Sequence, residues 1–339
     1  MGVIVKFLFI TLLVACSKSD RPVDPVLPVQ PVVYRAIHVS TAAQLKAALL
    51  GARPGDDIIL ADGLYNGRFV VNPTVPGTAA AGIILRGGRN AVLDGESIQT
   101  GYVLHLQADY WTVKGFTLTN GLKGIMADGV NHSIIDSVKL YNIGEEAIHL
   151  RKFSSNNIIR NTEITNTGLK TPDYGEGIYI GSAKSNWATY TNGQPDLCDS
   201  NLVENNMIGP GITAECIDIK EGTTAGIIRN NNFDATGITG ANSADSWMDM
   251  KGNYYLVEGN NGFNPTGSVM KDGFQVNVAY TGWGNYNEFR NNTCHVNAIG
   301  YGFLVKLSSS NGTAVGNKVY SNNMVYGAGS GVSNIPLSN

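Results

Sequence analysis

Short runs of alternating apolar and polar residues recur along most of this chain. In the run Glu215-Cys-Ile-Asp-Ile-Lys220, the two isoleucines face one way and the residues between and after them face the other, as in a strand with one buried face. Each run is followed by Asn-rich turns and another short apolar run. Repeats of roughly 20 to 40 residues built in this way predict a solenoid of stacked coils. Related runs begin at Glu146, Glu176, Ser246, Asp272 and Tyr301.

The predicted fold class is all-β, a single-stranded right-handed parallel β-helix with an N-terminal capping helix. Residues 39–50 have helical spacing, with Ser40 or Thr41 as the N-cap, and we expect this helix to cover the open end of the solenoid. Paired Asn residues in the turns predict ladders of side-chain hydrogen bonds. The pairs of residues expected to point inward are Leu104/Leu106, Ile125/Ala127, Ile148/Leu150, Ile178/Ile180, Ile217/Ile219, Met248/Met250, Phe274/Val276 and Phe303/Val305.

Composition narrows the class of protein further. Of 339 residues only 15% are charged, 41 are glycine, and the net charge is −3. Many tight turns and few charges suit an all-β repeat domain, which we place at residues 34–339. Because there is no surplus of basic residues, neither a nucleic acid nor a membrane surface is expected as a partner.

The N-terminal residues are typical of an exported lipoprotein. An apolar run follows Lys6 and ends in Leu13-Val-Ala-Cys16, which resembles a bacterial lipobox. We therefore predict a signal peptide at residues 1–16, a lipid on Cys16 and a flexible, Pro-rich tether at residues 17–33. The expected location is the bacterial cell envelope, at the outer membrane, with the lipid at Cys16 as the contact with the membrane. We expect a monomer.

Three cysteines remain after Cys16, namely Cys198, Cys216 and Cys294. An odd number does not describe a disulfide framework, although Cys198 and Cys216 are close enough in sequence to pair. The spacing indicates no zinc site.

Stacking the runs places the outward residues in columns, on coils about 4.8 Å apart. Acids and cations on neighbouring coils therefore lie close enough to interact. The first column holds Glu146, Glu176, Glu215 and Asp272; the second holds His105, His149, Tyr179, Asp218, Asp249 and Gln275; the third holds Arg151, Lys220, Lys251, Asn277 and Lys306.

Four acids on neighbouring coils of these columns offer the hard oxygen ligands that Ca²⁺ prefers. Without a cation, so many close carboxylates would raise one another's pKa. The alternative is that some of them pair with Lys220 and Lys251 as an exposed ladder of charges, which stabilises little. The candidate metal ligands are Glu176, Glu215, Asp218 and Asp249.

The sequence also resembles a known family of enzymes. Residues 54–65, Gly77-Thr78, residues 92–95 and residues 113–116 are similar to the opening of polysaccharide lyase family 6, the alginate lyase and chondroitinase B group. Residues 215–220 resemble that family's Glu-x-Ile-x-x-Lys turn. The similarity covers roughly residues 37 to 235.

This resemblance implies that Glu215 binds calcium and that Lys220 is the Brønsted base. The sequence departs from the family in two places. Thr213 stands where those enzymes have a second acid, and residues 249–252 contain Lys251 where they carry a catalytic Arg in a short Arg-His-Gly run. We therefore expect a related site with a rearranged set of residues.

β-Elimination of a uronate polymer needs a group that neutralises the carboxylate, a base for the C5 proton and a donor for the departing O4. A cation held by the acids serves the first step, and Lys220 the second if its pKa is lowered by Ca²⁺ and by a nearby lysine. The sequence does not choose a donor. The candidates are Lys251, Arg151, His149 and Tyr179.

The predicted function is a Ca²⁺-assisted lyase of an acidic polysaccharide such as alginate, a galacturonan or a glycosaminoglycan. A glycoside hydrolase, a C5-epimerase and a surface protein that only binds glycans remain alternatives, because fold alone does not decide among them. The candidate substrate-binding residues are Tyr179, Gln275, Asn277, Lys306 and Trp247.

Overall fold

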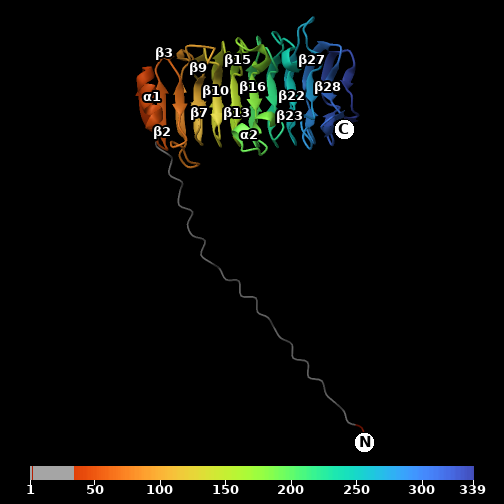
Figure 1. The fold of residues 1–339 in the computed structure, drawn as a ribbon, viewed down its shortest axis with the longest axis horizontal. Coiled ribbons are helices and arrows are strands. Elements are labelled where there is room, and N and C mark those ends of the chain that lie inside the picture. The colour runs from red at the N-terminus through yellow and green to blue at the C-terminus, as the bar shows by residue number, and fades with distance from the viewer. Residues whose placement is uncertain (1, 3–33) are drawn as a thin grey trace. The chain divides into compact units, whose positions relative to one another are not determined.

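The structure is a computed structural model that describes Gly2 and residues 34–339. The predicted tether, Cys16 and the rest of the predicted signal peptide lie outside the described residues and stay predictions. From Tyr34 onward the chain winds into a parallel β-helix, as predicted (Figure 1). Each full coil adds one strand to each of three parallel sheets, so two sheets of ten strands correspond to ten full coils.

One sheet has twelve strands. Its strands begin at Arg35 and end at Ser338, and neighbours pair in parallel throughout. In order they are β1 (Arg35–Val39), β2 (Asp56–Leu60), β5 (Ile83–Gly87), β8 (Trp111–Lys114), β11 (Ile134–Asp136), β14 (Ile158–Arg160), β17 (Leu202–Glu204), β20 (Ile227–Arg229), β23 (Leu256–Glu258), β26 (Glu288–Arg290), β31 (Lys318–Tyr320) and β34 (Leu337–Ser338).

The second sheet, which we call the turn sheet, follows the twelve-stranded sheet in every coil. It consists of β3 (Gly63–Asn66), β6 (Ala91–Asp94), β9 (Thr117–Thr119), β12 (Lys139–Tyr141), β15 (Glu163–Thr165), β18 (Met207–Ile208), β21 (Asn232–Asp234), β24 (Asn261–Phe263), β27 (Thr293–Ala298) and β32 (Met324–Ala328).

The third sheet carries the chemistry and is called the site sheet below. A separate antiparallel hairpin, β29 (Ser308–Ser309) and β30 (Gly312–Thr313), follows its strand β28. The site sheet consists of β4 (Phe69–Val71), β7 (Tyr102–Leu106), β10 (Lys123–Asp128), β13 (Ile148–Arg151), β16 (Ile178–Ile180), β19 (Ile217–Ile219), β22 (Met248–Met250), β25 (Phe274–Val276), β28 (Tyr301–Val305) and β33 (Gly331–Ser333).

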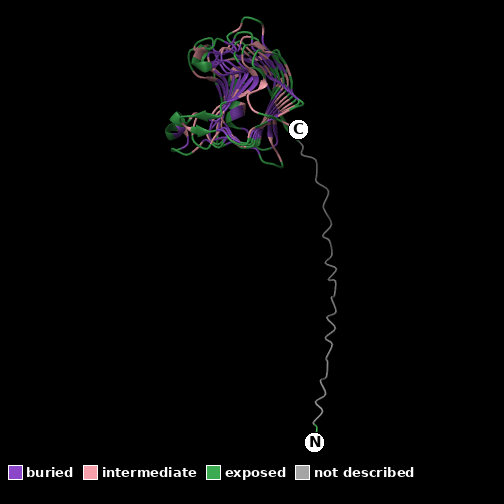
Figure 2. Cartoon of the chain, turned by 90° about the vertical axis from the view of Figure 1, so that its right-hand side faces the viewer, coloured by how far each residue is buried: buried purple, intermediate pink, exposed green. Residues whose placement is uncertain are grey.

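The core lies inside the coils, where the predicted inward pairs stack on one another. Ile217 is the cross-strand neighbour of Ile178 and Met248, and Phe274 is that of Met248 and Phe303. All five are buried. Most buried residues belong to the coils, and many exposed ones belong to the outer loops (Figure 2). The residues that the alternation predicted to point inward therefore do so in the structure.

Helix α1 (Ala42–Leu50) covers the N-terminal end of the solenoid and contacts β1, β3 and β4. Its N-cap is Thr41, whose hydroxyl accepts the backbone N–H of Gln44 at 3.2 Å. The predicted capping helix is thus confirmed, but it begins later than expected because Val39 is the last residue of β1. Among the described residues, no helix has the length and apolar character that crossing a membrane requires.

The Asn-rich turns form a buried ladder, as predicted. Asn206, Asn231, Asn260, Asn292 and Asn323 are stacked in consecutive coils, and each amide donates to the side-chain oxygen of the next at 2.9 to 3.0 Å. The same oxygens also accept a backbone N–H from the preceding coil. This ladder fixes the turn between the twelve-stranded sheet and the turn sheet.

Candidate functional site

Strand pairing places the predicted second column in register. Tyr179 on β16 is the neighbour of Asp218 on β19, Asp218 that of Asp249 on β22, and Asp249 that of Gln275 on β25. On the other side His149 on β13 is the neighbour of Tyr179. These side chains therefore stand side by side on the outer face of the site sheet.

The third column follows directly after the strands. Lys220, Lys251, Asn277 and Lys306 each donate a backbone N–H to the site-sheet strand of the preceding coil at 2.8 to 3.0 Å. Gly181 fills the equivalent position after β16. Three cations and an amide are thus lined up beside the acids of the second column.

Part of this face is buried, although its side chains point away from the core, and Tyr179, Lys220 and Lys251 are half-buried. Asp218 and Glu176 are each 3% exposed, and His149 is 6% exposed. The sequence offered an exposed ladder of charges as an alternative, whereas Asp218 at its centre is buried. Burial results from the long loops between strands, which form walls at both ends of the site-sheet strands.

The first wall precedes the strands and contains two short 3₁₀ helices, η1 (Pro172–Tyr174) and η3 (Ala241–Ser243), which contact each other. Thr213, which stands at the predicted position of a second acid, donates its hydroxyl to the carbonyl of Pro172 at 3.0 Å. Thr213 therefore ties the wall to the coil that carries Glu215.

The second wall follows the strands and contains η2 (Lys184–Asn186) and α2 (Trp187–Tyr190). Trp187 packs edge to face on Tyr280 of the loop after β25, with ring centroids 5.5 Å apart. The buried carboxylate of Asp196 accepts the backbone N–H groups of Lys152 and Phe153 at 3.1 and 2.8 Å. These contacts hold the wall against the neighbouring coils.

A cavity of about 330 Å³ lies between the two walls. Its floor includes Lys220, Lys251 and Lys306, and its sides include Ser243 from the first wall and Ala279 from the loop after β25. We call this cavity the trough. It follows the stack of coils, because its floor residues come from successive strands of the site sheet.

Asp218 lies at the centre of the trough floor between two lysines. Its carboxylate contacts Nζ of Lys220 at 2.5 Å and Nζ of Lys251 at 2.8 Å, and Lys251 also contacts Asp249 at 2.7 Å. Burial by itself would raise the pKa of Asp218, but the two ammonium groups lower it below its usual range. The acid–lysine pairing that the sequence offered as an alternative is therefore present, in a buried form.

The same contacts act on the lysines. Burial by itself would lower the pKa of Lys220, but the carboxylate of Asp218 outweighs it and raises this pKa above its ordinary value. Lys251 has a raised pKa for the same reason, with Asp218 and Asp249 as the charges that oppose burial. The lowered pKa that we expected for Lys220 depends on Ca²⁺ as well as on Lys251, and it stays a prediction; Lys251 beside Asp218 does not by itself lower this pKa below its ordinary value.

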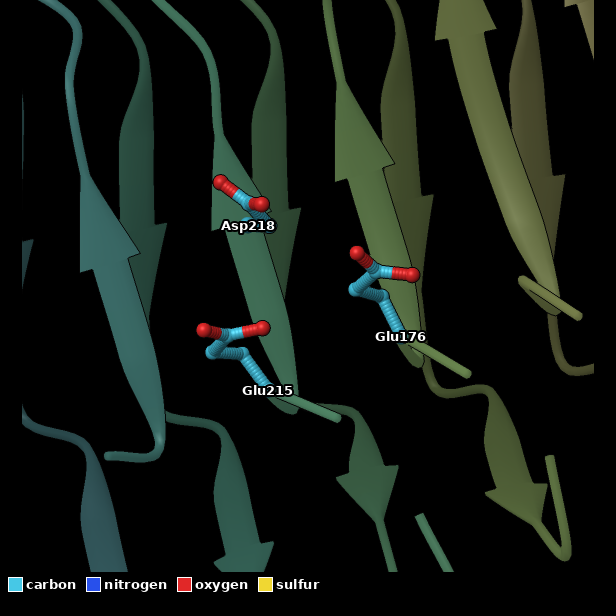
Figure 3. A group of neighbouring side chains, drawn as sticks. All are labelled: Glu176, Glu215 and Asp218. Carbon is cyan, nitrogen blue, oxygen red and sulfur yellow. The ribbon is translucent and has the colours of Figure 1, made fainter. Parts of the chain in front are cut away.

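Two acids form no salt bridge among the described residues: Glu215, which lines the trough, and Glu176, which stands on the preceding coil. Ligand oxygens of Glu176, Glu215 and Asp218 lie within 4.8 Å of one another (Figure 3). Oε2 of Glu176 is buried and has no hydrogen-bond partner in the part of the chain that the structure describes. Burial, together with the charges of Asp218 and Asp249, raises the pKa of Glu215 to about 8, and burial and neighbouring acids raise the pKa of Glu176 well above its usual range.

This trio fits a calcium ion. Three carboxylates within reach of one point match the oxygen donors that Ca²⁺ prefers, and the unpartnered oxygen of Glu176 leaves a coordination position free. The fourth predicted ligand, Asp249, is not part of this trio, and its carboxylate contacts Lys251 and the amide of Asn277. Three of the four predicted ligands thus lie together, and one of them, Asp218, also contacts Lys220 and Lys251.

Tyr179 lies beside Lys220, whose Nζ is 4.7 Å from the centroid of the tyrosine ring. Burial, with the charge of Asp218, raises the pKa of Tyr179 well above its usual range, so the phenol keeps its proton at neutral pH. His149 packs on the same ring at a centroid distance of 4.3 Å. Its Nε2 must donate to the carbonyl of Gly181 at 2.9 Å, because a carbonyl only accepts. His149 therefore orients Tyr179.

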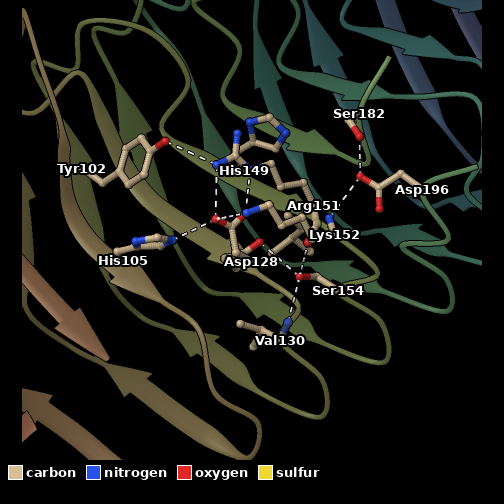
Figure 4. A network of polar contacts seen from close by, with 12 residues as sticks. Tyr102, His105, Asp128, Val130, His149, Arg151, Lys152, Ser154, Ser182 and Asp196 are labelled. Atoms are coloured by element: carbon tan, nitrogen blue, oxygen red, sulfur yellow. Dashed lines mark hydrogen bonds and ion pairs between the residues drawn. The ribbon is translucent and has the colours of Figure 1, made fainter. Parts of the chain in front are cut away.

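Arg151 belongs to a separate cluster two coils toward the N-terminus (Figure 4). Its guanidinium binds both carboxylate oxygens of Asp128, at 2.5 and 3.2 Å, and lies over the ring of Tyr190. Asp128 also faces Nε2 of His105 at 2.9 Å and Nζ of Lys152 at 3.4 Å. The structure does not bring Arg151 to Lys220, so its candidacy as a catalytic residue is not supported.

The predicted substrate-binding residues lie in different environments in the structure. Trp247 is a wrong prediction, because it is fully buried in the core, packs on Phe274 and donates its ring N–H to the carbonyl of Phe263 at 3.0 Å. Gln275 is buried and donates to Asp245 and Asp272. Tyr179 stands beside the lysines, while Asn277 and Lys306 line the trough.

Sequence reasoning missed two acids, Asp128 at the end of a site-sheet strand and Asp196 in a loop outside the strand repeat. Asp128 and Asp196 organise the Arg151 cluster and the second wall, and no motif marks either of them. Asp128 could have been found from its register, because it ends β10 opposite Arg151. Cys198, Cys216 and Cys294 are buried and free, so the possible pair of Cys198 with Cys216 does not form.

The fold and the trough define a class of enzyme, and comparison with known proteins agrees. Models of protein families gave no match, and neither did a search of curated proteins. Solved structures gave matches, among them parallel β-helix lyases that act on polysaccharides. The chain belongs to these parallel β-helix polysaccharide lyases.

Within that class, the chain is 42% identical to an alginate lyase from Paenibacillus sp. str. FPU-7. The match covers 88% of this chain and 99% of that one, with a TM-score of 0.78. The pectate lyase Pel9A, at 15% identity, has a TM-score of 0.58 over 86% of this chain and 79% of its own. The PL6 family alginate lyase AlyGC, at 20% identity, has a TM-score of 0.51 over 84% of this chain and 40% of its own. These two share the fold.

Proposed function

We propose that this polysaccharide lyase cleaves uronic-acid chains, with alginate as the first substrate to test, by β-elimination in the trough. The observation that carries the proposal is the half-buried group of Lys220, Lys251 and Tyr179 around the buried Asp218. Beside it lie two acids that form no salt bridge within the described part of the chain. An anionic sugar that enters this trough meets ammonium groups at the floor. The 42% identical alginate lyase supports the choice of substrate.

Lys220 is the proposed base for the C5 proton. It lies on the trough floor, but Asp218 keeps it protonated in the free protein, so it becomes a base only when the charge of Asp218 is balanced in another way. Lys251 already shares Asp218 and supplies part of this balance. A calcium ion held by Glu176, Glu215 and Asp218 would add positive charge there and neutralise the substrate carboxylate.

Tyr179 is the proposed donor to the departing O4. Its phenol keeps a proton at neutral pH and lies next to Lys220, so base and donor face the same sugar. In the part of the chain that the structure describes, its hydroxyl has no hydrogen-bond partner, which leaves it for the substrate. Lys251 and His149 then hold Asp218 and the Tyr179 ring in place.

The envelope location is a further part of the proposal. It rests on the lipobox-like Leu13-Val-Ala-Cys16 and the Pro-rich residues after it. A Cys16→Ser variant is expected to leave the membrane fraction of the producing cell, and the wild type is expected to stay there.

The direct test is the ultraviolet absorbance of the unsaturated uronate that elimination produces. Purified protein is incubated with alginate, polygalacturonate and glycosaminoglycans, with Ca²⁺ and with a chelator. A rise on alginate that chelation abolishes is the expected result. New reducing ends without the absorbance would mean hydrolysis, and no product from any polymer would overturn the proposal.

A further inference from the structure

Lys306 lies at the C-terminal end of the trough floor. It follows β28 directly and donates its backbone N–H to the carbonyl of Val276 at 3.0 Å, which continues the column of Lys220, Lys251 and Asn277. Its side chain is exposed and lines the trough. No carboxylate lies within 4.0 Å of its ammonium group among residues 34–339.

The other two lysines of the floor are not available in this way. Lys220 is held by Asp218, and Lys251 by Asp218 and Asp249. The amide of Asn277 donates to Asp249 as well. A carboxylate that enters the trough can therefore pair with Lys306 without displacing a protein acid, which makes Lys306 the natural partner for a second negative charge.

The distance from Lys220 to Lys306 along the trough floor can be compared with the length of a sugar unit in a polymer. Lys220 follows β19 and Lys306 follows β28, and these strands are three coils apart in the site sheet. Coils are about 4.8 Å apart, which is close to the length of one pyranose unit in an extended chain. The lining of the trough comes from these successive coils, which favours a chain that runs along the stack. A uronate chain would then present one sugar to each coil.

We infer that Lys306 binds the carboxylate of a uronate about three sugar units from the sugar at Lys220, on the side of the C-terminal coils. This inference rests on the proposed function and deepens it. Lys306 thus contributes to the binding of negatively charged chains that are long enough to reach it. It takes no part in proton transfer, because it does not contact the sugar that is cleaved.

The test compares Lys306→Ala with the wild type on the polyuronate and on a size series of its oligomers. We expect KM for the polymer and the longer oligomers to rise about three- to tenfold, as for a partly exposed charge pair, with kcat unchanged. The shortest oligomer that is cleaved should keep its KM. Lys306→Arg should restore most of the affinity, because it keeps the charge.

Lys318→Ala is the matched control, because Lys318 is an exposed lysine of the twelve-stranded sheet that pairs with Glu288. It should behave as wild type. Calorimetric binding of the same oligomers to Lys220→Ala and to the Lys220→Ala/Lys306→Ala double variant measures affinity without turnover. Weaker binding of long oligomers by the double variant supports the inference.

The two proposals fail in different ways. Turnover of polyuronate by Lys306→Ala with wild-type KM at every length would overturn the role of Lys306 and leave the proposed function standing. If the wild type cleaves no polyuronate, the proposed function fails, and the binding comparison alone decides for or against Lys306. Equal binding by the single and double variants would then overturn it.

Discussion

The chemistry of Lys220 depends on two neighbours, Asp218 and Tyr179. Its ammonium lies 2.5 Å from Asp218 and beside the ring of Tyr179. If Lys220 removes the C5 proton, Lys220→Ala should lower kcat by about 100-fold or more, since a positioned base contributes about that much. Binding of oligouronates should change only a few-fold, because Lys251 and Lys306 remain.

Initial rates by ultraviolet absorbance and calorimetric binding measure the two quantities. Lys139→Ala, on the turn sheet, is a suitable control because it removes a lysine that pairs with Glu163 at a distance from the trough. Turnover close to wild type in Lys220→Ala would disprove the assignment of the base.

Glu215 should make stability depend on pH. Burial raises its pKa from 4.5 to about 8, so the folded state binds a proton that the unfolded state releases between these values. Stability therefore falls as pH rises from about 5 to about 8 in the presence of a chelator. Glu215→Gln, which cannot ionise, should become progressively more stable than wild type over that range.

Urea unfolding at several pH values measures the effect, and Glu163→Gln on the turn sheet serves as the control. Added Ca²⁺ should reduce the fall in the wild type, since a cation favours the ionised carboxyl. Parallel pH profiles of the wild type and Glu215→Gln would contradict the environment assigned to this carboxyl.

Among the elements, the Asn ladder should respond most clearly to a single substitution. The amide of Asn231 donates to the carbonyl of Val203 and to Asn260, and its oxygen accepts from the backbone and side chain of Asn206. Asn231→Ala leaves buried groups on two coils unpaired and should cost about 2 to 4 kcal/mol of unfolding free energy. Asn232→Ala, at the exposed first position of β21, should change it by less than about 0.5 kcal/mol.

Denaturant unfolding of both variants provides the comparison. Equal changes in unfolding free energy for Asn231→Ala and Asn232→Ala would mean that the ladder does not stabilise the coils.

The strands and turns were predictable because their signals are local. Alternation gave the face of Ile217 and Asp218, and paired Asn residues marked the turns. The walls were not predictable in detail, because burial of the outer face depends on loops such as residues 182–199 that carry no repeat. Trp247 was misassigned for a related reason: its position before β22 looks outward in a regular strand, but its large ring turns into the core against Phe274.

A ladder of alternating charges on the twelve-stranded sheet was also missed. Each member pairs with an opposite charge on one neighbouring coil, except Asp136, which pairs on both sides, and most of the pairs are partly exposed. Such a ladder adds little stability but disfavours a shifted register, since a slip of one coil would bring like charges together. Its members are Lys114, Asp136, Arg160, Glu204, Arg229, Glu258 and Arg290.

At the scale of the whole molecule, the capping helix and the candidate catalytic residues lie on different coils of the solenoid. Each coil contacts only its neighbours, so stability is close to a sum of local terms. Leu49 of α1 is buried at the N-terminal end, whereas Lys220 follows β19 near the middle of the site sheet. Damage to the cap should therefore loosen the first coils and leave the trough intact.

Leu49→Ala tests this separation. Removing the buried side chain should cost the first coils about 2 to 5 kcal/mol of local stability. Hydrogen exchange should then speed up in β2, β3 and β4 and stay unchanged in β16, β19 and β22, and turnover well below the unfolding temperature should stay at the wild-type rate. Leu50→Ala, at a position that is 67% exposed, should change neither quantity. Faster exchange in all coils together would show that the solenoid unfolds as one cooperative unit, and the cap would then stabilise the trough as much as the coils it covers.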